Sequence, residues 1–597
     1  MKHVLLLAAM SLATAYAAAP DGAELYKQRC GICHDAKGQA RTPTRDEIGQ
    51  RTPEFIYRAM FEGAMLTQSV GLTDDEGRAI ARFLTGKEFG TAPISTVGKC
   101  SAAPGPLMLT DTSWNGWGND PTNGRYQPKP GLAASDVPKL KLKWAFGFVD
   151  ETIRSAQPTV VGDRVFIGSA SGNIYSLDAK TGCFYWVYDA GASVRTAISI
   201  GKVQGHDGYV AFFGDTRAMV HAVDAATGKA LWKVKVENHA AARVTGAPNF
   251  YDGRLYVPVS SLEEASSMLG TYECCTFRGS VVALDAATGK QIWKSFSVTD
   301  PPQRVKTSAT GTQQWGPAGA AIWSSPTVDV KKKVVYAATG NSYTDVSINT
   351  SNAILAFDLN TGSLLWASQV LPKDNFTMGC GRGVNCPEER GPDYDFGTSP
   401  ILRELPGGKR VLVCGQKSGI LWGLDPDARG KVLWQTRLGQ GSALGGIEWG
   451  HTADDLNAYA AVSDLVARGG KPGGIHAVKL ATGEEIWSTP APPLDCKPMS
   501  KGCTGAQSAA ISSMPGAVFS GSVDGHFRAY STKTGEIVWD FNTVQDYQTV
   551  NGVAGKGGSL DSAGPTIANG MVFTNSGYGM WLGMPGNVLL AFSVDGK

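Results

Sequence analysis

The sequence predicts an all-β, eight-bladed β-propeller preceded by a small all-α domain. From about residue 140, the chain repeats a motif in which an apolar strand is followed by Asp-x-x-Thr-Gly-x-x-x-Trp. Self-similarity at a period of roughly 45 to 70 residues, with a glycine turn inside each copy, is typical of propeller blades. The 74 Gly, 31 Pro and 15 Trp residues fit a turn-rich β protein.

The first residues carry the features of an export signal. Residues 1–19 hold a short Lys2-His3 head, an apolar stretch and an Ala17-Ala18-Ala19 end that suits signal peptidase. The stretch is too short to cross a bilayer, and no later one is apolar enough. We therefore expect an exported, periplasmic protein without a membrane span. The net charge of +2, with both signs mixed along the chain, does not indicate a nucleic-acid partner.

The next feature is a C-x-x-C-H motif at residues 30–34. This spacing is the attachment signature of a c-type haem. Cys30 and Cys33 would form the thioether bonds, and His34 would be the proximal ligand of the iron. The alternative for the two cysteines is a chance pair or a disulfide. We expect a small helical cytochrome c domain over residues 20–86.

The haem iron needs a second axial ligand, for which Met65 is our prediction. Met60 is the alternative, but it lies in a run with helical apolar spacing, where methionine usually packs in the core. After Met65, a Thr73-x-x-Glu76 pattern predicts a capped helix that runs to Leu84. Residues 87–112, rich in Gly, Pro, Ala and Ser, form the predicted linker to a propeller over residues 113–597.

Seven copies of the repeat are complete, and the eighth is split. The strand at residues 588–592 is followed by no Trp, whereas residues 140–144 form a strand that ends in Trp144 and has no Asp-Thr-Gly before it. We expect the amino-terminal strand to complete the last blade, because this removes the open sheet edge. Within each copy, Asp and Thr cap a turn, Gly supplies a positive φ, and Trp packs between blades.

The eleven cysteines fit an oxidising compartment. Beyond the haem pair, some of them lie close enough in sequence for short disulfides, although sequence alone does not determine the pairing. The candidate pairs are Cys380 with Cys386, Cys496 with Cys503, and Cys100 with Cys183. Cys274 and Cys275 are adjacent in the chain, and Cys414 is left over.

Polar residues at positions that the repeat does not need indicate where function lies. They cluster in the segments 245–278, 323–341, 393–397 and 416–419. With these segments, the chain resembles the pyrroloquinoline quinone (PQQ) dependent alcohol dehydrogenases. The haem motif together with Cys274-Cys275-Thr276-Phe277-Arg278-Gly279 is most similar to the cytochrome-containing polyvinyl alcohol dehydrogenases.

The resemblance implies a binding site for PQQ. Trp323 would stack under the planar quinone, although a core Trp is the alternative. Thr245 and Ser260 would donate hydrogen bonds to the cofactor carboxylates, and Arg195 or Arg278 would form an ion pair with them. Cys274 and Cys275 would form a disulfide over the opposite face of the quinone. Trp449 and Asn551 would line the pocket.

The resemblance also implies a calcium ion held by Glu263, Asn341 and Asp395, which supply the oxygen donors that Ca²⁺ prefers. Glu264 is the alternative to Glu263, and Asn341 has a second interpretation as a turn residue. Related enzymes that use lanthanides carry an Asp two residues beyond the catalytic one. Gly397 stands there in this chain, which favours calcium.

Asp395 is the implied general base, with Asp393 as its nearest rival. Lys417 would donate to the quinone oxygens, unless it is an ordinary solvated turn lysine. The implied reaction oxidises a polymeric or small alcohol to a carbonyl compound, and electrons pass through the haem to a soluble cytochrome c or a terminal oxidase. The competing hypothesis is a non-catalytic exported propeller that binds other proteins and carries an electron-storing haem.

Overall fold

The computed structural model describes residues 19–35, 43–61, 63, 65–66, 68–90, 96–308, 310–467, 469, 471–496 and 500–597. These residues form two compact units, one within residues 1–57 and 72–91 and the other within residues 58–71 and 92–597. The predicted export signal lies outside the described residues, apart from Ala19. In the described part of the chain, no helix is long and apolar enough to cross a membrane.

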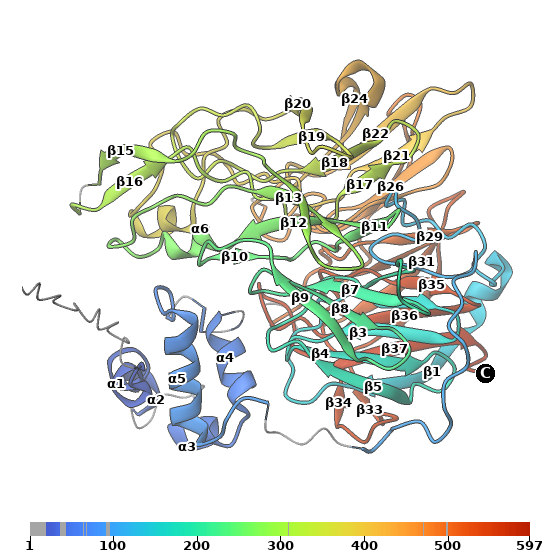
Figure 1. The fold of residues 1–597 in the computed structure, drawn as a ribbon. Coiled ribbons are helices and arrows are strands. Elements are labelled where there is room, and N and C mark those ends of the chain that lie inside the picture. Colours follow the sequence, from blue (N-terminus) through green and yellow to red (C-terminus); the bar gives the residue numbers. More distant parts are fainter. Residues whose placement is uncertain are drawn as a thin grey trace, which may run out of the picture. The chain divides into compact units, whose positions relative to one another are not determined.

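Short helices make up the amino-terminal region (Figure 1). The longest begins at the predicted capping box: Thr73 Oγ1 accepts a hydrogen bond from the Glu76 backbone N–H, and the Glu76 side chain accepts one from the Thr73 backbone N–H. Gly86, with φ 64°, ends this helix. The prediction of a capped helix here is confirmed. The helices are α1 (Gly22–Arg29), α2 (Gly31–His34), α3 (Arg45–Gly49), α4 (Pro53–Phe61) and α5 (Asp74–Thr85).

The rest of the described chain confirms the predicted eight-bladed propeller, because its strands form eight antiparallel sheets of four or more strands (Figure 1). In chain order, the first four blades are β2 (Thr159–Val161) to β5 (Phe184–Asp189), β6 (Ser199–Gly201) to β9 (Ala230–Lys235), β11 (Asn249–Tyr251) to β14 (Gln291–Phe296), and β17 (Thr327–Asp329) to β20 (Leu364–Gln369). The next three are β21 (Ile401–Glu404) to β24 (Lys431–Arg437), β25 (Thr452–Ala453) to β28 (Glu485–Thr489), and β29 (Ser512–Met514) to β32 (Ile537–Asn542).

The eighth blade joins the two ends of the propeller segment, as predicted. It contains β35 (Thr566–Ala568), β36 (Met571–Ser576) and β37 (Val588–Val594), and β1 (Leu140–Gly147) pairs antiparallel with β37. Trp144 lies opposite Ala591 in this pairing. This pairing covers the edge of β37 and makes β1 the outer strand of the blade.

The repeated turn has the contacts that the sequence predicts. In the first blade, Asp178 Oδ1 accepts hydrogen bonds from Thr181 N at 2.8 Å and Thr181 Oγ1 at 2.9 Å. Gly182 follows with φ 75°, and a Cβ there would lie 2.7 Å from the ring of Trp144 in the eighth blade. The glycine is therefore required twice, for the turn and for the close approach of the neighbouring blade's tryptophan.

Replacing Trp144 by alanine is expected to destabilise the propeller by about 3–5 kcal/mol, the usual cost of truncating a buried aromatic side chain. Trp144 is 5% exposed, and its indole N–H donates to Ala179 O in the first blade. The measurement is the free energy of unfolding, with the exposed Lys141→Ala on the same strand as control. An equal effect of the two substitutions would show that this blade contact does not stabilise the ring.

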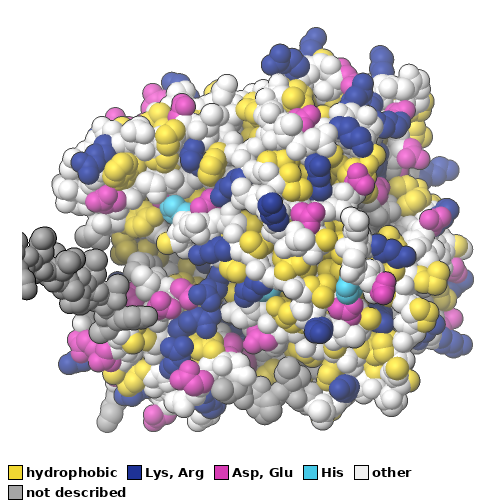
Figure 2. All heavy atoms as spheres, in the orientation of Figure 1, with side chains coloured by type: hydrophobic (Ala, Val, Ile, Leu, Met, Phe, Trp, Pro, Cys, Tyr) yellow, Lys and Arg dark blue, Asp and Glu magenta, His cyan; other side chains and the backbone are white. Residues whose placement is uncertain are grey.

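All four expected disulfides are present: Cys100–Cys183, Cys274–Cys275, Cys380–Cys386 and Cys496–Cys503. Cys414 is a buried free thiol. On the face shown in Figure 2, Lys and Arg side chains alternate with Asp and Glu over the propeller strands, which agrees with the net charge of +2.

Candidate active site

Four of the predicted site residues meet at the inner ends of two neighbouring blades. Trp323 precedes β17, Asn341 follows β18 (Val334–Ala338), Asp395 precedes β21, and Lys417 lies in the turn between β22 (Arg410–Gly415) and β23 (Ile420–Asp425). Asp395 joins them: its Oδ1 accepts from Asn341 N at 2.7 Å, and its Oδ2 accepts from Trp323 Nε1 at 3.1 Å. Lys417 Nζ lies 3.4 Å from the same Oδ2.

The loop that carries Asp395 is held by a buried carboxylate. Asp374 Oδ1 accepts from Asp393 N at 2.9 Å, and its Oδ2 accepts from Tyr394 N at 2.7 Å. Lys417 N also donates to Asp395 O at 3.0 Å. The backbone on both sides of Asp395 is thus fixed, which aims its side chain at Trp323.

The site carries more negative than positive charge. Burial alone would lower the pKa of Lys417, but Asp393 and Asp395 outweigh this effect and raise it, so Lys417 is a cation. The pKa of Asp393 is well above its usual range because of burial, which the nearby Lys417 only partly offsets. Burial and the charges of Asp393 and Asp395 likewise raise the pKa of Glu264. An added cation would relieve this repulsion.

Asn341 has an oxygen suited to that cation. Its Nδ2 donates to Ser342 O at 2.9 Å and to Phe376 O at 2.8 Å, which fixes the orientation of the amide. Its Oδ1 is buried without a hydrogen-bond partner. An orphaned acceptor beside carboxylates fits a hard metal ion such as Ca²⁺.

The two adjacent glutamates of α6 (Glu263–Ser266) have different surroundings. Glu263 is fully buried and anchors the cysteine loop: its Oε1 accepts from Thr276 N at 2.8 Å, and its Oε2 accepts from Phe277 N at 2.9 Å. Tyr272 Oη also donates to it at 3.0 Å. Glu264, in contrast, interacts with Asp393 and Asp395. The charges near Glu264 are thus those of the site, whereas both carboxylate oxygens of Glu263 accept hydrogen bonds from the backbone.

A pocket with an empty volume of about 350 Å³ opens beside Trp323. Trp449 meets Trp323 edge to face with the ring centroids 5.3 Å apart, and the Arg195 guanidinium lies 4.7 Å from the Trp449 centroid. Thr245 lines the same pocket, and its Oγ1 lies 2.8 Å from Ser260 Oγ. The pocket thus gathers four of the predicted cofactor residues, with Ser260 directly behind Thr245.

Two pocket residues that the sequence analysis missed have unsatisfied polar atoms. Trp117 Nε1 and Ser324 Oγ are buried without hydrogen-bond partners. Together with the Arg195 cation and the flat face of Trp323, these groups fit a planar ligand rich in acceptors and negative charge, as PQQ is. Ser324 follows Trp323 directly, so its position was available from sequence, whereas Trp117 reaches the pocket only through tertiary folding.

Three predicted cofactor contacts lie elsewhere. Arg278 donates to Val298 O at 3.2 Å and Thr299 O at 3.0 Å and packs on a phenylalanine ring, so it is not among the residues that line the pocket. Asn551 exchanges hydrogen bonds with the backbone of Gly147 on β1, which corrects its assignment to the pocket rim. The Cys274–Cys275 disulfide does not line the Trp323 pocket, and Cys274 faces a separate hollow.

The haem motif lies on α2. Cys30 and Cys33 are free thiols, the second exposed, and His34 Nδ1 lies 2.8 Å from Pro43 O. That contact requires Nδ1 to carry the proton and leaves Nε2 available for a metal. Met60 is 4% exposed, in agreement with a core role, whereas Met65 is half-buried.

The raised pKa of the buried Asp561 carboxyl group can be tested through the pH dependence of stability. Burial raises its pKa from 3.8 to about 7, although Ser562 N and Arg195 favour its charged form. The folded state therefore holds this proton more tightly, and the stability it contributes is lost as pH rises from about 4 to 7. Asp561→Asn should gain unfolding free energy relative to the wild type over this range, by at most about 1.4 kcal/mol per pH unit. Parallel pH profiles of the two proteins would refute the shift, and the exposed Asp546→Asn is the control.

Comparisons with known proteins identify the family of this chain. A family model described as outer membrane protein assembly factor BamB matches residues 128–384, 279–500 and 471–597. A polyvinylalcohol dehydrogenase from Pseudomonas sp is 45% identical over 97% of this chain and 94% of the relative's length. Another, from Sphingopyxis sp. (strain 113P3), is 44% identical over 97% and 93%. This chain belongs to the PQQ-dependent alcohol dehydrogenases.

A solved PQQ-dependent enzyme shares the fold. The quinohemoprotein alcohol dehydrogenase ADHIIG from Pseudomonas putida HK5 aligns with a TM-score of 0.62 at 19% identity, over 82% of this chain and 81% of that chain. As a PQQ-dependent alcohol dehydrogenase, the protein is an enzyme, and the hypothesis of a non-catalytic scaffold is set aside.

Proposed function

We propose that this enzyme is an exported quinohaemoprotein that oxidises polyvinyl alcohol, or a secondary alcohol like it, to the carbonyl compound. The observation that carries the proposal is the bond from Trp323 Nε1 to Asp395 Oδ2, at the edge of a pocket with unsatisfied donors. It sets a basic oxygen at the edge of the Trp323 ring. The substrate class follows from the two relatives named polyvinylalcohol dehydrogenase.

Residues of the Trp323 pocket would hold the cofactor. Trp323 offers its face to the ring system, Arg195 would pair with a carboxylate, and Thr245, Ser324 and Trp117 are placed to donate hydrogen bonds. Ser260 would act behind Thr245, and Trp449 would form a wall. Bound PQQ supplies the acceptor for the hydride of the alcohol's carbinol carbon.

We assign the calcium ligands to Glu264, Asn341 and Asp395, since Glu263 is engaged by backbone N–H groups. Ca²⁺ held by these residues would supply a Lewis acid. A lanthanide ion would require a carboxylate side chain at position 397, as in the related enzymes that use lanthanides. A Cβ on Gly397 would lie 2.1 Å from the Trp323 ring, so no side chain is tolerated there, which favours calcium.

The protein's own part in the reaction is proton transfer and positioning. Asp395 accepts the hydroxyl proton of the alcohol at Oδ2. Trp323 Nε1 and Lys417 Nζ hold this oxygen from two directions, so its orientation is set before the substrate binds. The Lys417 cation balances the negative charge that collects near the carboxylates and would donate to the quinone oxygens.

The electron exit would be the covalent haem. We propose a cytochrome c domain over residues 20–86, a linker over 87–112 and the PQQ-binding propeller over 113–597. Cys30 and Cys33 would hold the haem c, His34 would bind its iron through Nε2, and Met65 stays our predicted distal ligand. Attached haem supplies a one-electron carrier, from which a soluble periplasmic cytochrome c or a terminal oxidase takes the electrons.

The test is an absorbance titration of the purified full chain. PQQ and Ca²⁺ are added, and the haem spectrum is followed as polyvinyl alcohol, a secondary alcohol or a primary alcohol is supplied. We expect haem reduction with the polymer and the secondary alcohol. Absence of reduction with every alcohol would overturn the proposal, and reduction by primary alcohols alone would overturn its substrate class.

A further inference from the structure

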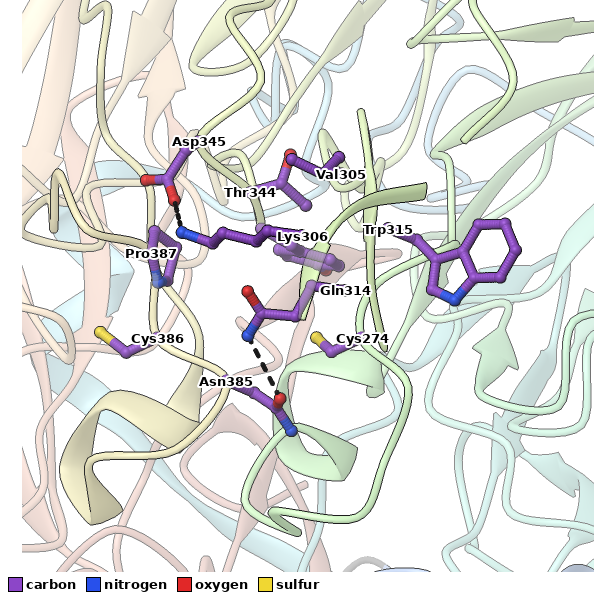
Figure 3. Close-up of a pocket in the computed structure, with 11 residues that line it drawn as sticks. Cys274, Val305, Lys306, Gln314, Trp315, Thr344, Asp345, Asn385, Cys386 and Pro387 are labelled. Atoms are coloured by element: carbon purple, nitrogen blue, oxygen red, sulfur yellow. Dashed lines mark hydrogen bonds and ion pairs between the residues drawn. The ribbon is translucent and has the colours of Figure 1, made fainter. Parts of the chain in front are cut away.

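A second hollow, outside the Trp323 pocket, lies between a hairpin and a disulfide-closed loop (Figure 3). The hairpin is β15 (Gln303–Thr307) with β16 (Gln313–Gly316), and the loop contains the Cys380–Cys386 disulfide. A disulfide lies in each of its opposing walls, because both Cys274 and Cys386 line it.

One residue that lines this hollow lies close in sequence to the active site. Tyr343, which lines the hollow, is 3% exposed and follows Asn341 by two residues. Only Ser342 separates Tyr343 in the chain from Asn341, a proposed calcium ligand.

The polar groups of the hollow suit neutral hydroxyls. Thr344 is 9% exposed, and its Oγ1 is buried without a hydrogen-bond partner. Gln314 Nε2 reaches toward Asn385 Oδ1 but stays 3.5 Å away, at the limit of a hydrogen bond (Figure 3). These groups are left with capacity for a ligand that both donates and accepts.

The charges in the hollow are already matched within the protein. Lys306 Nζ lies 3.0 Å from Asp345 Oδ2 (Figure 3). It also lies 2.6 Å from Glu388 Oε1. Because these two carboxylates neutralise the Lys306 cation, we do not expect the hollow to select an anion. Apolar surface from Val305 and Pro387 completes the lining. This combination fits a chain in which CH₂ groups alternate with hydroxyl-bearing carbons.

We propose that this hollow is a binding subsite for a hydroxyl-bearing aliphatic chain, and that it holds a segment of a polymeric alcohol remote from the carbinol being oxidised. The inference rests on the proposed function, since it requires an alcohol with many hydroxyls as substrate. The Thr344 hydroxyl and the Gln314 amide bind hydroxyl groups of that segment.

The test compares kcat/KM for polyvinyl alcohol with kcat/KM for a small secondary alcohol, using the holoenzyme. Thr344→Val keeps the shape of the side chain and removes the unpartnered hydroxyl, and Gln314→Ala removes the amide. We expect each to lower the polymer-to-small-alcohol ratio of kcat/KM by about three- to tenfold, through a higher KM for the polymer. Gln303→Ala, an exposed glutamine of the same hairpin, should keep the wild-type ratio.

Stability separates binding from a structural role. Because Thr344 Oγ1 has no partner in the folded protein, Thr344→Val should keep or raise the melting temperature. An unchanged ratio in both variants, or a wild type that oxidises small alcohols only, would overturn the subsite. A wild type that oxidises no alcohol at all would overturn the proposed function instead.

Discussion

Asp395→Asn is expected to lower kcat for alcohol oxidation by about 10²–10⁴-fold, the usual contribution of a general base. Asparagine keeps the shape of the side chain and an oxygen that can still accept from Asn341 N, but it does not take up the hydroxyl proton. PQQ binding should persist, because the substitution leaves Trp323 and Arg195, the proposed cofactor contacts, in place. The measurement is haem reduction at saturating alcohol, together with cofactor binding by absorbance titration.

Asp393→Asn is the matched control, since Asp393 lies two residues away and also contacts Lys417, at 3.3 Å. It has no contact with Trp323 among those that the structure gives for its side chain, so its loss should cost much less than the loss of Asp395. If Asp393→Asn abolished turnover and Asp395→Asn retained it, the base would have to be reassigned to Asp393.

The second large effect distinguishes Glu264 from Glu263. Glu264→Gln should weaken calcium binding by at least about tenfold, because it removes a charged oxygen ligand. The measurement is calcium affinity from the rise in melting temperature with added Ca²⁺. Half-maximal protection should move to higher calcium concentration, while the melting temperature without calcium should not fall, since the substitution relieves repulsion from Asp393 and Asp395.

Glu263→Gln should behave in the opposite way. Both carboxylate oxygens of Glu263 accept backbone N–H groups, from Thr276 and Phe277. A glutamine would turn an NH₂ group toward one of these donors, at a cost of about 1–3 kcal/mol. The melting temperature should therefore fall with and without calcium, and the calcium midpoint should stay in place. A loss of calcium affinity in Glu263→Gln alone would restore Glu263 as the ligand.

The propeller could be predicted because each blade carries its own local signal. The Asp178–Thr181 turn forms from side chain to neighbouring backbone, and this short-range chemistry is visible in sequence. The closure by β1 was predictable for a different reason. The last copy of the repeat has a strand but no Trp, and the segment 140–144 has a strand and the missing Trp144, so the two segments complete one blade. The short spacings between cysteines also favoured the disulfides that the structure contains.

The site was only partly predictable, because long-range contacts decide it. Glu263 and Glu264 are adjacent on a helical turn and point roughly 100° apart, and backbone N–H groups 13 and 14 residues later determine which one is engaged. Likewise, Asn551 meets Gly147 across the ring closure, a contact between residues 404 positions apart in the chain. A local sequence pattern cannot predict a hydrogen-bond partner that is so distant in the chain.

The pairing of β1 with β37 also has a consequence for synthesis. Trp144 leaves the ribosome long before Ala591, its partner across the sheet. At ordinary elongation rates of about 5–20 residues per second, β1 waits roughly 20–90 s for β37. During that time seven blades can form in order while the first strand keeps an unpaired edge. β37 therefore decides whether the ring closes, and a chain that stops short of β37 leaves an unpaired strand edge that can aggregate.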